Sequence, residues 1–93
     1  MKRPNGEQIQ AEIDWLKANK SKVRKHSAFE DNHHDSIDGQ IRALEGRFDE
    51  DDMQREFSDE PSNVQESVRD AILWMEGEEE VSPSLNWKPL VQK

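Results

Sequence analysis

Hydrophobic residues recur three or four positions apart along four stretches of the chain, which is the spacing that lines one face of an α-helix. The clearest stretch predicts a helix over about 32–45. Asp31 can cap its first backbone N–H groups, and Gly46 can take the left-handed conformation that ends a helix. Its apolar face is narrow and needs other helices to cover it. That face holds His34, Ile37, Ile41 and Leu44.

The stretch before it predicts a longer helix over about 6–25. Asn5 and Gln8 have the spacing of a capping box, and the apolar stripe is Ile9, Ile13, Leu16, Lys20 and Val23, with Trp15 beside it. Two long helices joined by a short link favour an antiparallel hairpin. Gly39, inside the second helix, favours close approach of another helix.

Two further helices follow, at about 50–57 and 63–76. Asp49 is the expected N-cap of the first, with acidic residues filling its first turn. Ser62 and Gln65 have capping-box spacing at the start of the second, and Gly77 is the expected stop. Residues 1–77 are therefore predicted to form one helical domain.

Residues 78–93 contain two prolines and no helical period, so an extended C-terminal tail is predicted. The tail is too apolar for a solvated segment, because it carries Leu85, Trp87, Leu90 and Val91. We expect it to fold back over the hairpin or to lie on a neighbouring subunit. The predicted fold class is all-α: an antiparallel helical hairpin, a short helix, a further helix and this tail.

Composition adds an expectation about assembly. Hydrophobic residues make up 31% of the 93 residues and charged residues 37%, against about 45–50% and about 25% in average domains. A core formed by one chain alone is expected to be marginal. The sequence therefore predicts a homo-oligomer, most simply a two-fold dimer. The expected interface residues are Ile13, Trp15, Lys20, His34, Ile37, Ile41 and Leu44.

The net charge of −8 is unevenly distributed: residues 1–27 carry +4 and residues 28–93 carry −12. An acidic surface repels nucleic acid and attracts basic proteins, so direct nucleic-acid binding is not expected. The expected partner is a protein with a basic surface. Candidate partner-binding residues are Asp49, Glu50, Asp51, Asp52, Glu56, Asp59, Glu60, Trp74 and Trp87.

Chemistry-bearing motifs are sparse. The chain has no cysteine, and His33-His34-Asp35 with Asp38 nearby is too small a set for a structural zinc site. No nucleophile motif or phosphate-binding glycine loop is present. We therefore expect no enzyme activity, no metal and no cofactor. The sequence shows neither a signal peptide nor an apolar run long enough for a membrane span, so a cytoplasmic protein is expected.

Three segments, ANKSKVRKH, IDGQIRALEGRFDEDD and VRDAILWMEGEEE with the later SPSLNWKPL, resemble in style the small acidic accessory proteins of tailed phages and prophages. The resemblance implies a protein that binds and inhibits a host protein, such as a nuclease or a defence complex, for example by occupying a nucleic-acid-binding surface. It transfers no functional residue. Two alternatives stay open: an oligomeric structural or adaptor protein, and an antitoxin-like neutraliser of a basic toxin.

Overall fold

A computed structural model describes residues 3–23 and 33–91 of the chain, and all the regular elements in these ranges are helical. This confirms the predicted all-α class. The helices are α1 (Gly6–Asn19), α2 (His33–Gly46), α3 (Glu50–Glu56), α4 (Ser62–Met75) and α5 (Pro83–Trp87), with short 3₁₀ turns at Lys20–Lys22 and Lys88–Leu90.

The first four helices begin and end close to their predicted positions. The difference lies in α1, which ends at Asn19 and passes into the 3₁₀ turn, whereas a helix to about residue 25 was predicted. Asn5 and Gln8 form the predicted capping box at its start. At α3, Asp49 caps the helix, and its reciprocal partner in the box is Asp52.

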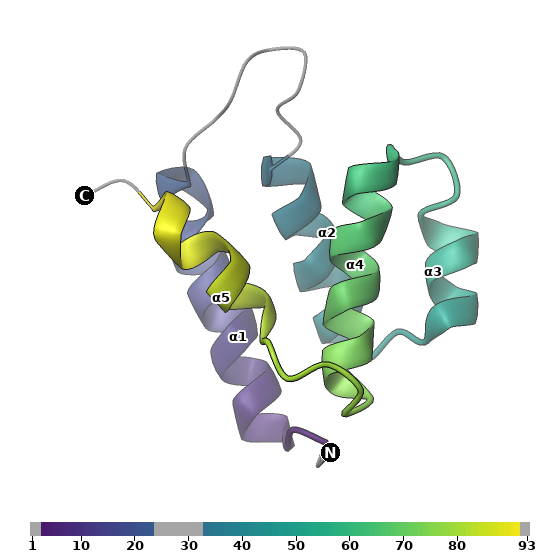
Figure 1. Cartoon of the computed structure of the whole chain (residues 1–93), viewed down its shortest axis with the longest axis horizontal. Coiled ribbons are helices and arrows are strands. Elements are labelled where there is room, and N and C mark those ends of the chain that lie inside the picture. The colour runs from purple at the N-terminus through teal and green to yellow at the C-terminus, as the bar shows by residue number, and fades with distance from the viewer. Residues whose placement is uncertain (1–2, 24–32, 92–93) are drawn as a thin grey trace.

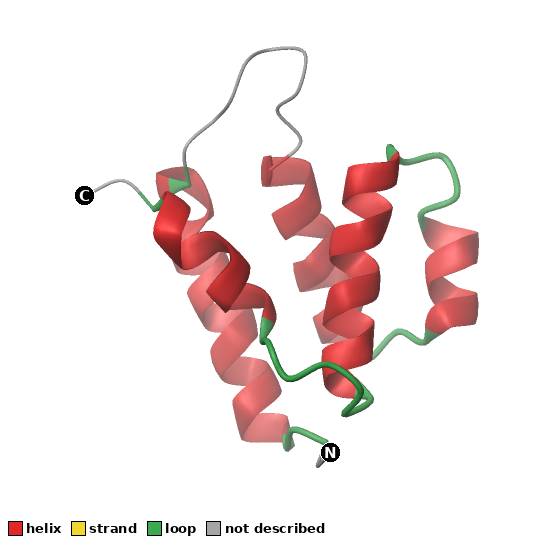
Figure 2. Cartoon of the chain, viewed as in Figure 1, coloured by secondary structure: helices red, strands yellow, loops and turns green. Residues whose placement is uncertain are grey.

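The central element is α2, with α1 antiparallel to it on one side and α4 running parallel to it on the other (Figure 1). α3 lies along the outer side of α4, and α5 crosses over α1 and contacts α4 (Figure 2). The result is a helical layer in which α2 is covered from both sides.

The protein has two hydrophobic clusters, and α2 contributes residues to both. The first joins α1, α2, α4 and α5 and contains Ile9, Ile13, Leu16, Val23, Ile37, Ile41, Leu44, Ala71 and Trp87. The second lies between α2, α3 and α4 and contains Ala43, Met53, Phe57, Val64, Val68 and Ile72. Among the described residues, the large hydrophobic side chains left exposed are Val81 and Leu85. A single chain thus covers most of its own apolar surface.

Gly39 sets the separation of α2 and α4, as its position in the sequence predicted. A Cβ atom at this residue would lie 2.7 Å from Val68 Cγ2 and 3.3 Å from Phe57 Cε1. Carbon atoms in ordinary contact are about 3.5–4.0 Å apart. The two helices therefore approach more closely than any side chain at this position would allow.

The predicted extended tail is wrong, because residues 83–90 form α5 and a 3₁₀ turn. Ser82 precedes Pro83 at the first helical position, a combination that favours a helix start. The Glu12 carboxylate of α1 completes that start by accepting hydrogen bonds from the Ser84 N–H (2.8 Å) and the Ser84 hydroxyl (2.9 Å). The negative charge of Glu12 is also stabilised by the backbone dipoles, whose positive ends lie at the helix N-terminus.

The expectation that this segment folds back over the hairpin is confirmed. Trp87 is buried in the first cluster, and its indole N–H donates to Gln40 Oε1 at 2.7 Å. The Gln40 amide in turn donates to the Ser67 carbonyl at 2.8 Å. This buried polar chain connects α5, α2 and α4, and Val91 forms an antiparallel bridge with Val23.

Of the two helices predicted to end at a left-handed glycine, α4 does so and α2 does not. Gly77 ends α4 with φ 80°, as predicted. Gly46 is instead the last residue of α2, and the left-handed residue is Arg47, with φ 53°. The Phe48 N–H donates to the Ala43 carbonyl across this turn, at 2.9 Å. Within residues 3–23 and 33–91, no helix combines the length and apolar character needed to cross a bilayer.

Candidate protein-binding surface

The carboxylates of α3 are largely compensated by arginines. Glu50, Asp52 and Glu56 form ion pairs with Arg69, Arg55 and Arg42, respectively. All three pairs are substantially exposed to solvent, so each contributes little to stability. α3 therefore presents alternating charges and not a continuous anionic face.

Asp52 has a second role inside its own helix. A hydrogen bond from the Asp49 backbone N–H, together with the Arg55 guanidinium, holds the pKa of Asp52 below its ordinary value of 3.8. Asp49 is likewise committed, because its carboxylate accepts the Asp52 N–H at 2.9 Å. These two residues stabilise the helix start and are poorly suited to bind a partner.

Apart from the helix cap Asp49, the acidic candidates that make no ion pair with any described residue are Asp51, Asp59 and Glu60. Asp59 and Glu60 lie together in the turn that joins α3 to α4. This turn is held by the Gln65 side-chain amide, which donates to the Phe57 carbonyl at 2.9 Å and to the Glu60 carbonyl at 3.0 Å.

Gln65 thus differs from its predicted role. The expected capping box of Ser62 and Gln65 is wrong, because Pro61 occupies the cap position and no side-chain cap is formed. Gln65 reaches backward and fixes the turn. The carboxylates of the turn are consequently presented on an ordered backbone.

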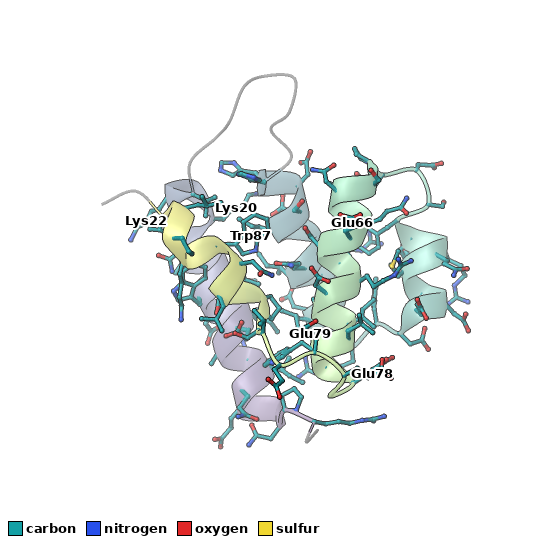
Figure 3. All side chains as sticks on the ribbon, in the orientation of Figure 1. Lys20, Lys22, Glu66, Glu78, Glu79 and Trp87 are labelled. Carbon is teal, nitrogen blue, oxygen red and sulfur yellow. The ribbon has the colours of Figure 1, made fainter. Side chains whose placement is uncertain are left out.

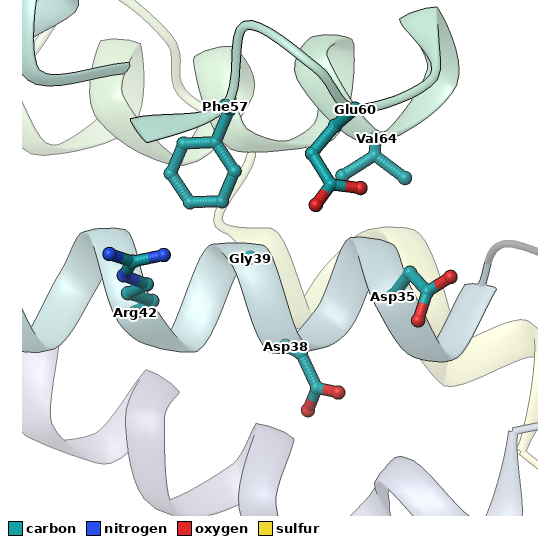
Figure 4. A pocket seen from close by; sticks show the side chains of 7 residues that line it. All are labelled: Asp35, Asp38, Gly39, Arg42, Phe57, Glu60 and Val64. Atoms are coloured by element: carbon teal, nitrogen blue, oxygen red, sulfur yellow. The ribbon is translucent and has the colours of Figure 1, made fainter. Parts of the chain in front are cut away.

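A cavity of about 290 Å³ lies between this turn and the N-terminal half of α2 (Figure 4). It is lined by Asp35, Asp38, Gly39, Arg42, Phe57, Glu60 and Val64. Gly39, Phe57 and Val64 form an apolar floor. At Gly39 the α2 backbone is buried, because Val68 and Phe57 of the neighbouring elements pack closely against it.

The charged side chains that line the cavity differ in whether they already form an ion pair. Asp38 points away from Phe57 and Glu60 in Figure 4 and pairs with Lys20 of the 3₁₀ turn at 2.8 Å. Arg42 pairs with Glu56. Asp35 and Glu60 make no ion pair with the described residues, so they leave the cavity with two uncompensated negative charges.

The two tryptophans proposed as partner anchors have different environments. Trp74 is partly buried and packs against the first cluster. Trp87 is 6% exposed and donates its indole N–H inside the core, so its assignment to partner binding is wrong.

Most of the expected oligomer-interface residues are covered by the chain itself. Ile13, Ile37, Ile41 and Leu44 are between 0 and 9% exposed, because α1, α4 and α5 enclose the apolar face of α2. Their assignment to an intersubunit contact is therefore wrong. The oligomeric state itself stays a prediction.

The remaining three interface candidates are partly exposed and make contacts within the chain. Lys20 pairs with Asp38. His34 Nε2 lies 3.4 Å from the Val23 carbonyl, and Lys88 Nζ lies 5.7 Å from the centre of the Trp15 ring.

The histidine cluster is dispersed in the structure. The His33 ring packs edge-on against Trp87, with 5.3 Å between ring centres. Among the described residues, no three histidine or acidic side chains come together as a potential metal site. Asp31, which belongs to the same stretch of sequence, lies outside the described residues.

Sequence reasoning missed two features of the surface. The first is Asp35, whose spacing from Gly39 and Arg42 places all three on one face of α2 and could have indicated the cavity. The second is an acidic group on α4 and the following loop, where Glu66, Glu78 and Glu79 are labelled in Figure 3. Burial, then Glu79 and Glu66, raise the pKa of Asp70 in this group above 3.8.

Comparisons of the chain with protein-family models, with curated proteins and with solved structures found no match.

Proposed function

We propose that this chain is an acidic binding protein that occupies a basic surface of a partner protein and thereby inhibits it. The observation that carries the proposal is the cavity between α2 and the α3–α4 turn. Asp35 and Glu60 at this cavity have no cationic partner among the described residues, and Gly39, Phe57 and Val64 supply its apolar lining.

The combination of charge and apolar surface is what supports binding. Uncompensated carboxylates mainly accelerate the encounter with a basic protein, whereas buried apolar and aromatic contacts supply most of the affinity. The cavity offers both within a few residues. Asp59, beside Glu60 on the same turn, adds a further exposed negative charge.

The mode of inhibition follows from the sign of the charge. A basic surface that binds nucleic acid recognises phosphate with arginine and lysine side chains. A protein carboxylate bound to those side chains prevents phosphate from reaching them. A host nuclease or a defence complex is thus the class of target that agrees with the resemblance to small phage proteins.

The test is a capture experiment from a lysate of the host cells with two charge-reversed variants. One variant carries Asp35→Lys, Asp59→Lys and Glu60→Lys. Its matched control carries Glu76→Lys, Glu78→Lys and Glu80→Lys, which are also exposed carboxylates without a described ion pair and which change the net charge equally.

The wild-type chain and the control are expected to retain the same protein, and the cavity variant is expected to lose it. Retention should fall as salt is raised, since the contact is electrostatic. The retained protein should lose its activity when one equivalent of the chain is added. Equal capture by both variants, or full activity of the captured protein in the complex, would contradict the proposal.

A further inference from the structure

We propose that the cavity between α2 and the α3–α4 turn is a binding site for one arginine side chain of the partner, with Asp35 and Glu60 holding its guanidinium over the Phe57–Val64 floor. This inference rests on the proposed function and identifies the group that the partner supplies. It concerns residues whose charges no cation among residues 3–23 and 33–91 compensates.

The first argument is the distribution of charge around the cavity. Asp35 comes from the first turn of α2, and Glu60 comes from the α3–α4 turn, so the two carboxylates approach the cavity from different elements. A guanidinium has five N–H donors in a planar fork and can reach two carboxylates at once. A lysine ammonium is a compact point charge that binds its water more strongly.

The second argument is an arginine already present at this edge of the cavity. The Arg42 guanidinium carbon lies 5.5 Å from the centre of the Phe57 ring and 5.9 Å from that of Phe48, while the guanidinium pairs with Glu56. Both distances are within the range of a cation–π contact. The chain thus uses one guanidinium between a carboxylate and Phe57, and the cavity repeats this combination with Glu60 as the carboxylate.

The third argument is the shape of the site. In Figure 4 the Phe57 ring and the Glu60 carboxylate both point into the space above Gly39. Gln65 holds the turn from behind, so little ordering of the site is required on binding.

The test uses a defined probe and does not require the partner. The ¹⁵N-labelled chain is titrated with a blocked tripeptide that has arginine between two glycines, and its amide chemical shifts are followed by NMR. Parallel titrations use the same peptide with lysine or with the uncharged arginine analogue citrulline. The Asp35→Asn and Glu60→Gln double variant is then compared with a matched control.

The matched control is the Glu7→Gln and Glu78→Gln double variant. Glu7 lies in the first turn of α1, as Asp35 lies in the first turn of α2. Glu78, like Glu60, is an exposed loop carboxylate without a described ion pair. Both variants remove two negative charges and leave the two hydrophobic clusters intact.

We expect saturable shifts concentrated at Gly39, Phe57 and Glu60 with the arginine peptide. Binding should be about tenfold weaker for each carboxylate removed, as is typical of a lost charge-assisted hydrogen bond. The control should bind like the wild type, and the citrulline peptide should produce no shifts in the cavity.

Three results would overturn the inference. Equal binding of the lysine peptide would show that the cavity recognises any positive charge and not the guanidinium group in particular. Shifts spread evenly over the acidic surface would show that there is no specific site. Unchanged binding by the cavity variant would place the contact elsewhere. Each result leaves the proposed function standing if the capture experiment succeeds, so the two failures are distinguishable.

Discussion

Replacing Gly39 with alanine tests whether the close contact of α2 and α4 is a real constraint on the fold. Two effects of opposite sign compete. Alanine is favoured over glycine by about 1 kcal/mol in a helix interior, which stabilises the folded state. The added methyl carbon, however, would lie 2.7 Å from Val68 Cγ2, about 1 Å inside ordinary contact distance.

The contact with Val68 cannot be relieved cheaply. A valine in a helix has one strongly preferred rotamer, so Val68 cannot simply swing aside. Phe57 Cε1 lies 3.3 Å from the same methyl position, so the methyl group cannot shift toward Phe57 either. Relief requires that α2 and α4 move apart, and such overpacking costs about 1–3 kcal/mol. The expected net effect is destabilisation by about 1 kcal/mol.

The measurement is thermal and urea unfolding followed by circular dichroism. A loss of about 1 kcal/mol lowers the melting temperature by about 4–8 °C in a domain of this size. Gly6→Ala is the control, because nothing lies within 4 Å of a Cβ atom at Gly6 in α1. The control should be neutral or stabilised. If Gly39→Ala is stabilised as well, the helices do not approach as described and the reasoning is refuted.

Three further substitutions test other features. Arg47→Gly should stabilise the chain by up to about 1 kcal/mol in urea unfolding, because a left-handed residue other than glycine costs about 1–2 kcal/mol. The loss of the Arg47 hydrogen bond to the Leu44 carbonyl offsets part of this gain. A lower urea midpoint would contradict the prediction. Trp87→Phe should destabilise by about 1–3 kcal/mol, because it leaves Gln40 Oε1 buried without a donor, and an unchanged midpoint would show that this hydrogen bond is unimportant. Asp70→Asn should raise the melting temperature at neutral pH: the pKa of Asp70 is raised in the folded state, so its ionisation favours unfolding as pH rises. This advantage should disappear at pH values below 3.8, and an advantage that persists there would have a cause other than ionisation.

The helices that could be predicted from sequence are those whose ends are determined by neighbouring residues. Asn5 caps α1 through Gln8, and Asp49 caps α3 through Asp52, in both cases three positions away. The apolar stripes of α2 and α4 likewise repeat within one helix. Such signals are local, and a single sequence contains them in full.

The features that could not be predicted depend on partners far along the chain. α5 has five residues, too few to show a period, and it is capped by Glu12, which lies 72 positions away. The burial of Trp87 depends on Gln40 in α2. The extent to which one chain buries its own apolar residues could not be predicted either, because composition does not show how a short C-terminal helix covers α1 and α2.

The candidate site was predicted by residue type but not by arrangement. Acidic residues near α3 were identified, yet the arginines that compensate them come from α2 and α4 as well as α3. Glu60 was among the predicted residues, whereas Asp35 was considered only for metal binding. The cavity arises because Gly39 lets α4 and the turn approach α2, and this proximity is a tertiary property.

The hydrogen bonds between Glu12 and Ser84 have a consequence for the order of folding during synthesis. The apolar face of α1 leaves the ribosome early, but Trp87, which covers part of it, is made more than seventy residues later. Until then this face is open to chaperones and to aggregation, and closing so long a loop slows the final step. We expect ribosome-stalled chains that expose residues only up to 82 to be cleaved rapidly by protease, and chains that expose residue 91 to be resistant.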